Sequence, residues 1–306
     1  MSEMWSVKNI PDLTGKVIIV TGANSGIGFE SAREFTRKGA TTILACRNME
    51  KAQAALDKIQ AEIPNSKAEI MCLDLASLQS VHEFAISFKA KYERLDVLLN
   101  NAGIMMVPFT ETEDGFESQL GTNHLGHFTL TGLLIDILER TPGSRVVNIS
   151  SGGHRFGIMD FDNLTYRGGN GYSRIGAYGR SKLSNLLFTY ELERRLEANG
   201  CNPIAVAAHP GLSETHLADH FWGGRLKRLS HVFMKFGAQS AAMGALPGIR
   251  AAVDPGVKGG QYYGPDGPRE RKGYPVPVQS NLASHDEADA KRLWQVSEEL
   301  TGVRYL

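Results

Sequence analysis

A short apolar segment followed by three glycines constrains the fold of this chain more than any other stretch. Residues 17–20 are apolar and β-branched, which predicts a buried strand. Gly22, Gly26 and Gly28 come next, and a helical pattern begins directly behind them. Such glycines let the backbone turn sharply and approach a ligand closely, while N–H groups at the start of the helix attract a phosphate. The spacing matches neither Gly-x-Gly-x-x-Gly nor a Walker loop, so an ordinary glycine-rich turn is the alternative for this loop taken alone.

Strand and helix patterns alternate along the rest of the chain. Further strands are expected at 41–45, 68–73, 97–99, 145–150 and 204–208. Helices are expected at 49–63, 78–92, 117–138 and 177–196. Repeated strand–helix units predict an α/β fold, a Rossmann-type doubly wound parallel sheet with helices on both faces. Because no polar linker or internal repeat interrupts the series, residues 1–306 are expected to form a single dinucleotide-binding domain.

Charge and cysteine content narrow the choice of partners. The 33 Lys and Arg residues balance the 33 Asp and Glu residues, which gives no electrostatic reason to expect nucleic acid as a partner. Cys46, Cys72 and Cys201 are widely scattered, so neither a disulfide framework, nor a zinc site, nor any other metal site is predicted. The N-terminus has no apolar signal-peptide core, and no run of about 18 apolar residues occurs. A cytoplasmic protein without a transmembrane segment is expected.

Polar residues follow two of the later strands, and a helix carries a third polar pair. The segment Asn100-Asn101-Ala102-Gly103 comes at a strand end, where ligands of open parallel sheets bind. Ser150 and Ser151 end the next strand. Tyr178 and Lys182 are four residues apart and therefore share one face of a helix. Each of these features alone is also compatible with an ordinary turn, a cap or a chance pair.

Taken in order along the chain, these residues resemble the short-chain dehydrogenase/reductase family. The resemblance runs from Gly15 to about Gly211, nearly the whole chain. The matching motifs are Thr21-Gly22-Ala23-Asn24-Ser25-Gly26-Ile27-Gly28, Asp74-Leu75, Asn100-Asn101-Ala102-Gly103, Asn123, Ser151, Tyr178/Lys182 and Pro210-Gly211. Residues 122–128, 181–185 and 209–211 resemble the retinol-dehydrogenase-like branch of that family.

The expected chemistry is carbonyl reduction or its reverse. A free tyrosine has a pKa near 10, and we expect the ammonium of Lys182 to favour the phenolate of Tyr178 and lower that pKa. Ser151 would hydrogen-bond the substrate oxygen as charge develops there. The resemblance implies that Asn123 helps to hold a proton-relaying water. Ser151 and Tyr178 are 27 positions apart, further than in many family members, so Ser150 stays an alternative to Ser151.

Cofactor choice depends on the end of the second strand. No acid stands there to bind a ribose hydroxyl, whereas Arg47 offers a guanidinium suited to a 2′-phosphate, although a solvated arginine is the alternative. NADP(H) is therefore favoured, and NAD(H) stays the alternative. The resemblance implies that Asp74 meets the adenine and Thr215 the nicotinamide carboxamide. The full set of cofactor contacts that it implies is Gly22, Asn24, Ser25, Gly26, Ile27, Gly28, Arg47, Asp74, Leu75, Asn101, Ala102, Gly103, Tyr178, Lys182, Pro210, Gly211 and Thr215.

The last third of the chain is expected to cover the substrate. Five apolar residues follow helical spacing among basic ones: Trp222, Leu226, Leu229, Phe233 and Phe236. This pattern favours a substrate lid at about 212–240, with a helix on a membrane surface as the alternative. Residues 259–277 are expected to be an extended loop. A capping-box pattern from Ser284 to Glu287 predicts a final helix at about 284–301, ending at Gly302.

The predicted function is that of an oxidoreductase. It would transfer a hydride between NADP(H) and a small apolar carbonyl or alcohol substrate. The alternative from another class is a non-catalytic, dinucleotide-sensing binding protein, against which the Ser151, Tyr178 and Lys182 set argues. A nucleotide-sugar epimerase is disfavoured by the glycine spacing and by the Asn100–Gly103 segment. The sequence is compatible with a homo-oligomer.

Overall fold

One eight-stranded sheet forms the centre of the computed structural model, which describes residues 4–212 and 238–306. The strand order is β3-β2-β1-β4-β5-β6-β7-β8. The strands are β1 (Val17–Thr21), β2 (Thr41–Cys46), β3 (Ala68–Cys72), β4 (Val97–Asn100), β5 (Arg145–Ile149), β6 (Ile204–Ala208), β7 (Tyr262–Pro265) and β8 (Pro275–Pro277). Neighbours pair in parallel from β3 through β7, and β8 alone runs antiparallel. The predicted doubly wound parallel sheet is confirmed.

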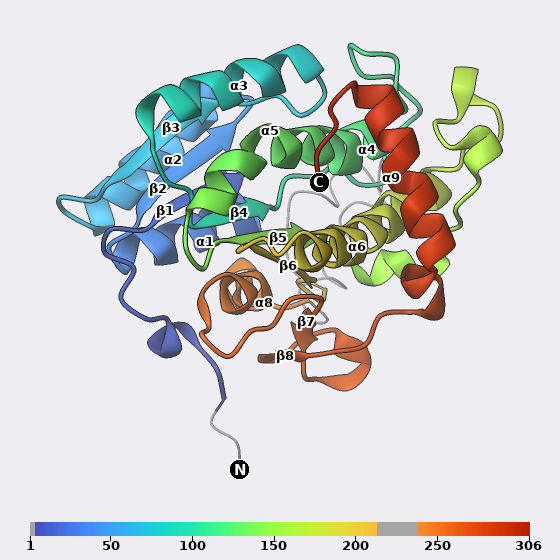
Figure 1. Cartoon of the computed structure of the whole chain (residues 1–306). Helices are drawn as coiled ribbons and strands as arrows, with labels where there is room; N and C mark the ends of the chain where they lie inside the picture. The colour runs from blue at the N-terminus through green and yellow to red at the C-terminus, as the bar shows by residue number, and fades with distance from the viewer. Residues whose placement is uncertain (1–3, 213–237) are drawn as a thin grey trace, which may run out of the picture.

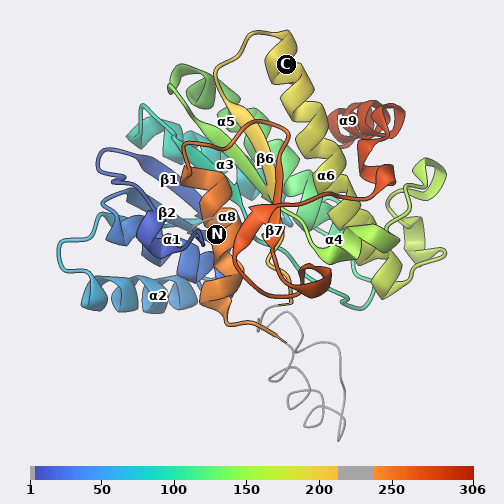
Figure 2. The same ribbon diagram turned by 90° about the horizontal axis from the view of Figure 1, so that it is seen from below.

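Helices cover both faces of this sheet (Figure 1). They are α1 (Gly26–Arg37), α2 (Met49–Glu62), α3 (Leu78–Lys91), α4 (Ser118–Leu120), α5 (Gly126–Arg140), α6 (Arg174–Ala198), α8 (Ala241–Val253) and α9 (Glu287–Thr301). Helices α3, α5, α6 and α9 lie on one face, and Figure 2 shows α1, α2 and α8 on the other.

The apolar strand at the start of the chain explains this layering. In β1, Ile18 and Val20 pack with α1 and α8, whereas Val17 and Ile19 pack with α3 and α5. A strand with a helical layer on each face is buried on both sides, so it reads as a continuous apolar run and not as an alternating one. The two resulting cores hold the sheet rigid, and its strand ends therefore present loops at fixed positions.

The helix expected at 117–138 is present but is not a regular α-helix. Its first turn, α4, passes into a π-helical turn at Gly121–Leu125 before α5 continues to Arg140. Glu117 caps the first turn, because its carboxylate accepts the N–H groups of Gln119 and Leu120, both at 2.8 Å. A π-helical turn displaces the residues on one side of a helix and often marks a functional site. Here it contains Asn123.

Three sequence expectations in the last third of the chain were wrong or incomplete. Residues 259–277 are not one extended loop, because they contain β7 and β8. The N-cap of α9 is Asp286 and not Ser284: Asp286 Oδ1 accepts the Asp289 N–H at 2.9 Å, while Ser284 lies in a preceding 3₁₀ turn. Helix α8 was not predicted, since glycines and Pro247 obscure its pattern. The end of α9 is as expected, with Gly302 left-handed at φ 69°.

The substrate lid predicted at about 212–240 falls almost entirely on residues 213–237, outside the described residues. Its apolar stripe therefore stays a prediction. In the part of the chain that the structure describes, no helix has both the length and the apolar character needed to span a bilayer.

Candidate active site

The carboxyl ends of β1, β4, β5 and β6 bring the predicted site segments to one edge of the sheet. Chain order reverses between β1 and its neighbours β2 and β4, which makes this edge the switch point where open α/β sheets bind ligands. The glycine loop follows β1, the Asn101 turn follows β4, Ser151 follows β5, and Pro210 with Gly211 follows β6.

The glycine loop and the Asn101 turn are docked onto each other. The Asn101 side-chain amide donates to the Thr21 carbonyl at 2.8 Å, and the N–H groups of Asn101 and Ala102 both donate to Thr21 Oγ1 at 2.9 Å. Gly22 is left-handed at φ 68°, and a Cβ on Gly28 would lie 2.4 Å from the Gly22 carbonyl oxygen. Both positions therefore require glycine, one for its backbone conformation and one for close packing. Around them, Ser25 is the N-cap of α1 and Ile27 is buried in its first turn.

A buried histidine that the sequence analysis did not single out connects this loop to the π-helical turn. His127 Nδ1 lies 3.0 Å from the Asn123 carbonyl oxygen, and its Nε2 lies 2.9 Å from Thr21 Oγ1. Because a carbonyl only accepts, Nδ1 carries the proton and Nε2 accepts from the Thr21 hydroxyl. Burial lowers the pKa of His127 to about 4, which keeps the ring neutral. The sequence signal that could have identified His127 is its position four residues after Asn123, on the same face of a helix.

Tyr178 and Lys182 lie one helical turn apart on α6 and are both buried. Lys182 Nζ donates to the Ile149 carbonyl at 3.0 Å and lies 5.9 Å from the centre of the Tyr178 ring. Burial lowers the pKa of Lys182 to about 8. Burial also raises the pKa of Tyr178, and the nearby Ser151 hydroxyl opposes that rise by hydrogen bonding. The expected lowering of the Tyr178 pKa by the ammonium was therefore wrong for this structure: burial raises that pKa, and the group that opposes the rise is Ser151, not Lys182.

The two consecutive serines face in different directions. Ser150 is buried, and its Oγ donates to the backbone carbonyl of Lys182 at 2.8 Å, which ties β5 to α6. Ser151 Oγ accepts the Gly153 N–H at 3.1 Å, and its hydroxyl is the group that opposes the rise of the Tyr178 pKa. Of the two, Ser151 is therefore the one beside the phenol.

Asn123 connects the turn after β4 to the helix that carries Tyr178. Its Oδ1 accepts the Ile104 N–H at 2.8 Å, and its Nδ2 donates to the Ile104 carbonyl and to Ser181 Oγ, both at 2.9 Å. A Cβ on Gly103 would lie 3.1 Å from Asn123 Oδ1 and 3.5 Å from Lys182 Nζ. Glycine at 103 thus keeps the space beside the lysine open.

The residues predicted to meet the adenosine half lie beyond β2 and β3. Arg47 is 72% exposed, and its guanidinium lies 3.7 Å from Asp74 Oδ2. The other carboxylate oxygen of Asp74 accepts the Ala76 N–H at 3.0 Å. Leu75 is buried in the core, where Gly126 lets its carbonyl approach α5 closely.

Beyond β6, the chain turns at Pro210 and Gly211, the latter left-handed at φ 65°. The Gly211 N–H donates to His209 Nδ1 at 3.3 Å, and His209 Nε2 lies 3.0 Å from Glu270 Oε2. Asn24 lies half-buried in the glycine loop. Thr215, predicted to meet the carboxamide, lies outside the described residues.

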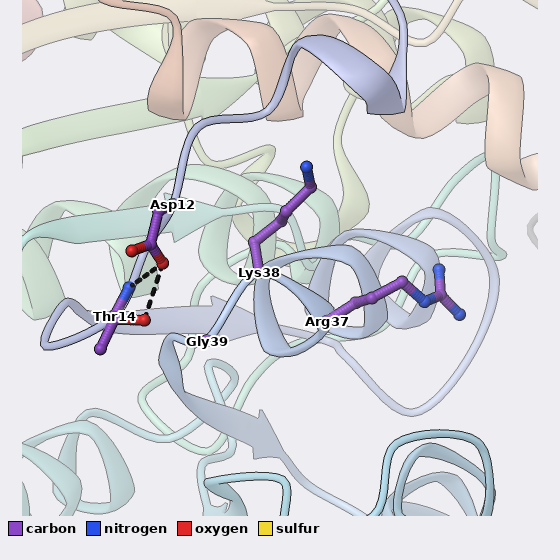
Figure 3. Close-up of a pocket in the computed structure, with 5 residues that line it drawn as sticks. All are labelled: Asp12, Thr14, Arg37, Lys38 and Gly39. Carbon is purple, nitrogen blue, oxygen red and sulfur yellow. Dashed lines mark hydrogen bonds between the residues drawn. The ribbon is translucent and has the colours of Figure 1, made fainter.

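Two cavities lie at different distances from this edge of the sheet. A surface cavity of about 350 Å³, lined by Asp12, Thr14, Arg37, Lys38 and Gly39, lies before β1 and β2, at the amino ends of the strands (Figure 3). It is therefore remote from the predicted site. A second cavity of about 220 Å³ is lined by Met106, Ser173, Arg174 and Ile175, at the start of the helix that carries Tyr178 one turn further on. No group of three or more His, Cys, Asp or Glu residues is placed to hold a metal ion within residues 4–212 and 238–306.

The fold and this edge define a class of protein, and comparison with known proteins agrees. The family model described as short chain dehydrogenase matches residues 16–223, more than half of the chain. The chain belongs to the short-chain dehydrogenase family and is an oxidoreductase of that family. An uncharacterised protein from Mycobacterium paratuberculosis has the same fold, with a TM-score of 0.82, 39% identity and coverage of 99% of this chain and 100% of that one.

Within the family, the chain falls in the retinol-dehydrogenase-like branch. It is 42% identical to retinol dehydrogenase 13 of Homo sapiens over 297 residues, covering 95% of this chain and 86% of that protein. It is 40% identical to retinol dehydrogenase 12 of Homo sapiens over 295 residues, covering 96% and 88%. A short-chain dehydrogenase from Shigella flexneri, complexed with NADP, shares the fold at a TM-score of 0.64 and 24% identity, covering 82% of this chain and 97% of that one.

Proposed function

We propose that this protein transfers a hydride between NADP(H) and an apolar carbonyl or alcohol substrate. The observation that carries the proposal is the buried arrangement of Tyr178 and Lys182 on one face of α6, with Ser151 beside the phenol. A purely binding protein would have no use for two buried ionisable groups at this position. Their burial is unfavourable for stability and is understandable where a proton has to move.

The side chains of this site have separable roles in the reducing direction. Ser151 donates a hydrogen bond to the substrate oxygen, and Tyr178 donates its proton to that oxygen as the carbonyl carbon gains a hydride. The nicotinamide supplies the hydride when it is bound. Lys182 supports the Tyr178 phenolate once the proton has left, and Asn123 fixes the loop and helix on either side. Oxidation of the alcohol runs through the same groups in reverse.

The chain offers a place for a dinucleotide that fits these roles. Gly22 and Gly28 remove the side chains that would fill the turn before α1, where a pyrophosphate would meet the helix N-terminus. Gly103 leaves room beside Lys182. Arg47, largely exposed at the end of β2, supports the choice of NADP(H), since a guanidinium pairs well with a phosphate. NAD(H) is the alternative, because the Asp74 carboxylate lies close enough to the Arg47 guanidinium to compete with a 2′-phosphate for it.

The substrate is proposed to be apolar. Met106 and Ile175 line the cavity at the start of α6, and three further large apolar side chains are exposed: Phe156, Ile158 and Leu212. The names of the relatives also support this choice, because retinol is a long apolar alcohol. We therefore propose extended apolar aldehydes, ketones or alcohols of the retinoid kind.

The decisive experiment mixes the purified protein with NADPH or NADH and a panel of aromatic and aliphatic aldehydes and ketones. The expected result is cofactor oxidation with product formation that is faster with NADPH and roughly 100-fold or more slower in Tyr178→Phe. Tight NADPH binding without turnover of any substrate would instead support the dinucleotide-sensing alternative.

Cytoplasmic location is proposed from the three free cysteines and is checked by cell fractionation. Light scattering of the purified chain decides whether it forms a homo-oligomer.

A further inference from the structure

One buried side chain connects the two segments that line the cavity at the start of α6. Gln119 lies in α4 and is fully buried. Its Oε1 accepts the Met106 N–H at 2.6 Å, and its Nε2 donates to the Arg174 carbonyl at 3.1 Å. Because a backbone N–H only donates and a carbonyl only accepts, these two partners fix the orientation of the amide. Gln119 thus connects the segment after β4 to the start of α6, which lies beside α4 (Figure 1 and Figure 2).

A second connection runs in parallel through a tyrosine. Gln119 Nε2 also donates to the Tyr172 hydroxyl at 2.9 Å, and that hydroxyl donates to the Val107 carbonyl at 2.7 Å. Burial raises the pKa of Tyr172 to about 12, so the phenol keeps its proton and this bond at neutral pH. The two segments are therefore joined by two routes, one through the Gln119 amide and one through the Tyr172 hydroxyl.

We call these hydrogen bonds of Gln119 and Tyr172 to residues 106, 107 and 174 the Gln119 clamp. The backbone is constrained at Met106 and at Gln119 itself. Met106 is left-handed at φ 53°, a conformation that is unfavourable for a residue with a side chain. Its hydrogen bond to Gln119 holds that conformation in place. The backbone of Gln119 is fixed in turn by Glu117, whose buried carboxylate accepts the Gln119 N–H at 2.8 Å.

The clamped cavity is close to the reacting group. Arg174, which lines it, precedes Tyr178 by four residues, so the two lie on one face of α6, about 6 Å apart along the axis. Because the cavity lies one helical turn before Tyr178, we expect the skeleton of a long substrate held at Tyr178 to extend into it and a small aldehyde to fall short of it.

We propose that Gln119 is a positioning residue that sets the spacing between Met106 and residues 172–175 and thereby selects extended apolar substrates. This inference rests on the proposed function. Without the amide, Met106 loses the bond that keeps it left-handed, and the cavity loses its shape while the Ser151, Tyr178 and Lys182 arrangement stays. The effect falls on the binding of long substrates and not on proton transfer.

The test uses Gln119→Met, which keeps the length of the side chain and removes its hydrogen bonds. Two quantities are measured: the KM for a size series of aldehydes with NADPH, and the Kd of the fluorescent naphthyl ketone prodan in the presence of NADP⁺, which cannot reduce it. We expect both the KM of the longest aldehydes and the prodan Kd to rise by roughly 10-fold or more. The KM of the smallest aldehyde and the Kd of NADPH should change less than about 2-fold.

Thr141→Val is the matched control. Thr141 is buried and accepts the Leu95 N–H at 3.1 Å, but it precedes β5 at the opposite edge of the sheet. Both variants lose a buried hydrogen bond, so both should melt earlier than the wild type. Only Gln119→Met should change the dependence of KM on substrate size. The same size dependence in Thr141→Val would show a general loss of stability and would overturn the inference, as would wild-type values in folded Gln119→Met.

A second variant decides the matter if Gln119→Met does not fold. Tyr172→Phe removes one hydroxyl and leaves the amide bonds to Met106 and Arg174, so we expect a prodan Kd raised by about 3-fold or more. Unchanged prodan binding in Tyr172→Phe would then refute the clamp. If the wild type reduces no substrate at all, the proposed function fails, whereas the prodan measurements still decide the role of Gln119.

Discussion

Replacing Lys182 with methionine should make the free protein more stable while it strongly lowers its activity. Burial lowers the pKa of Lys182 from 10.5 to about 8, so the folded protein disfavours the charged form. At 1.36 kcal/mol for each pKa unit, the charged lysine destabilises the fold by about 3 kcal/mol below pH 8. The bond from Nζ to the Ile149 carbonyl, worth about 1 kcal/mol, offsets part of this. That carbonyl still accepts from Asn185 Nδ2 at 3.1 Å in the variant, so it is not left unpaired.

We therefore expect Lys182→Met to gain roughly 2 kcal/mol in the free energy of unfolding at pH 7. The gain should depend on pH in a defined direction. Between pH 8 and 10.5 the unfolded chain holds a proton on Lys182 that the folded protein has released, so wild-type stability from this group rises with pH. The advantage of the variant should accordingly shrink toward zero by about pH 9.5.

Urea unfolding of the cofactor-free proteins at pH 7 and at about pH 9.5 measures this difference. Other groups titrate equally in both proteins and cancel. Lys58→Met, on the exposed face of α2, is the control, and its stability relative to wild type should not follow this pH dependence. A variant less stable than wild type at pH 7, or a difference that does not change with pH, would refute the reasoning. Turnover by Lys182→Met should fall by roughly 100-fold or more, as expected for a lost acid–base partner.

Three further predictions concern catalysis, cofactor choice and the lid. Tyr178→Phe should keep NADPH affinity while kcat falls by roughly 100-fold or more, and near-normal kcat would remove the tyrosine from catalysis. Arg47→Asp should weaken NADPH binding far more than NADH binding, because it replaces attraction to the 2′-phosphate with repulsion; titration of both proteins with both cofactors checks the ratio, and an unchanged ratio excludes Arg47. Truncating Trp222 and Phe233 together to alanine should raise KM for large apolar substrates and hardly affect small ones. Unaltered kinetics with lost liposome binding would point to a membrane-surface helix instead.

Local sequence patterns determined the framework of this protein. The β-branched run at 17–20 indicated a doubly buried strand, because only a parallel sheet with helices on both faces buries every side chain of such a run. The glycine loop and the four-residue spacing of Tyr178 and Lys182 depend on backbone conformation and helical period alone, and both were visible directly. The long separation of Ser151 and Tyr178 left Ser150 open; the position at the strand end favoured Ser151, and the fold shows that the two serines face opposite ways.

Tertiary structure decided what depends on neighbours distant in the chain. Strands β7 and β8 form in a segment rich in glycine and proline, because β6 offers an edge to pair with. The sequence pointed to an ammonium that lowers the pKa of Tyr178, but burial raises that pKa and lowers the pKa of Lys182, since desolvation depends on the whole surrounding fold. The hydrogen bonds of Gln119 join residues 13 and 55 positions away. No periodicity encodes such contacts, because they exist only once the sheet has brought the ends of its strands together.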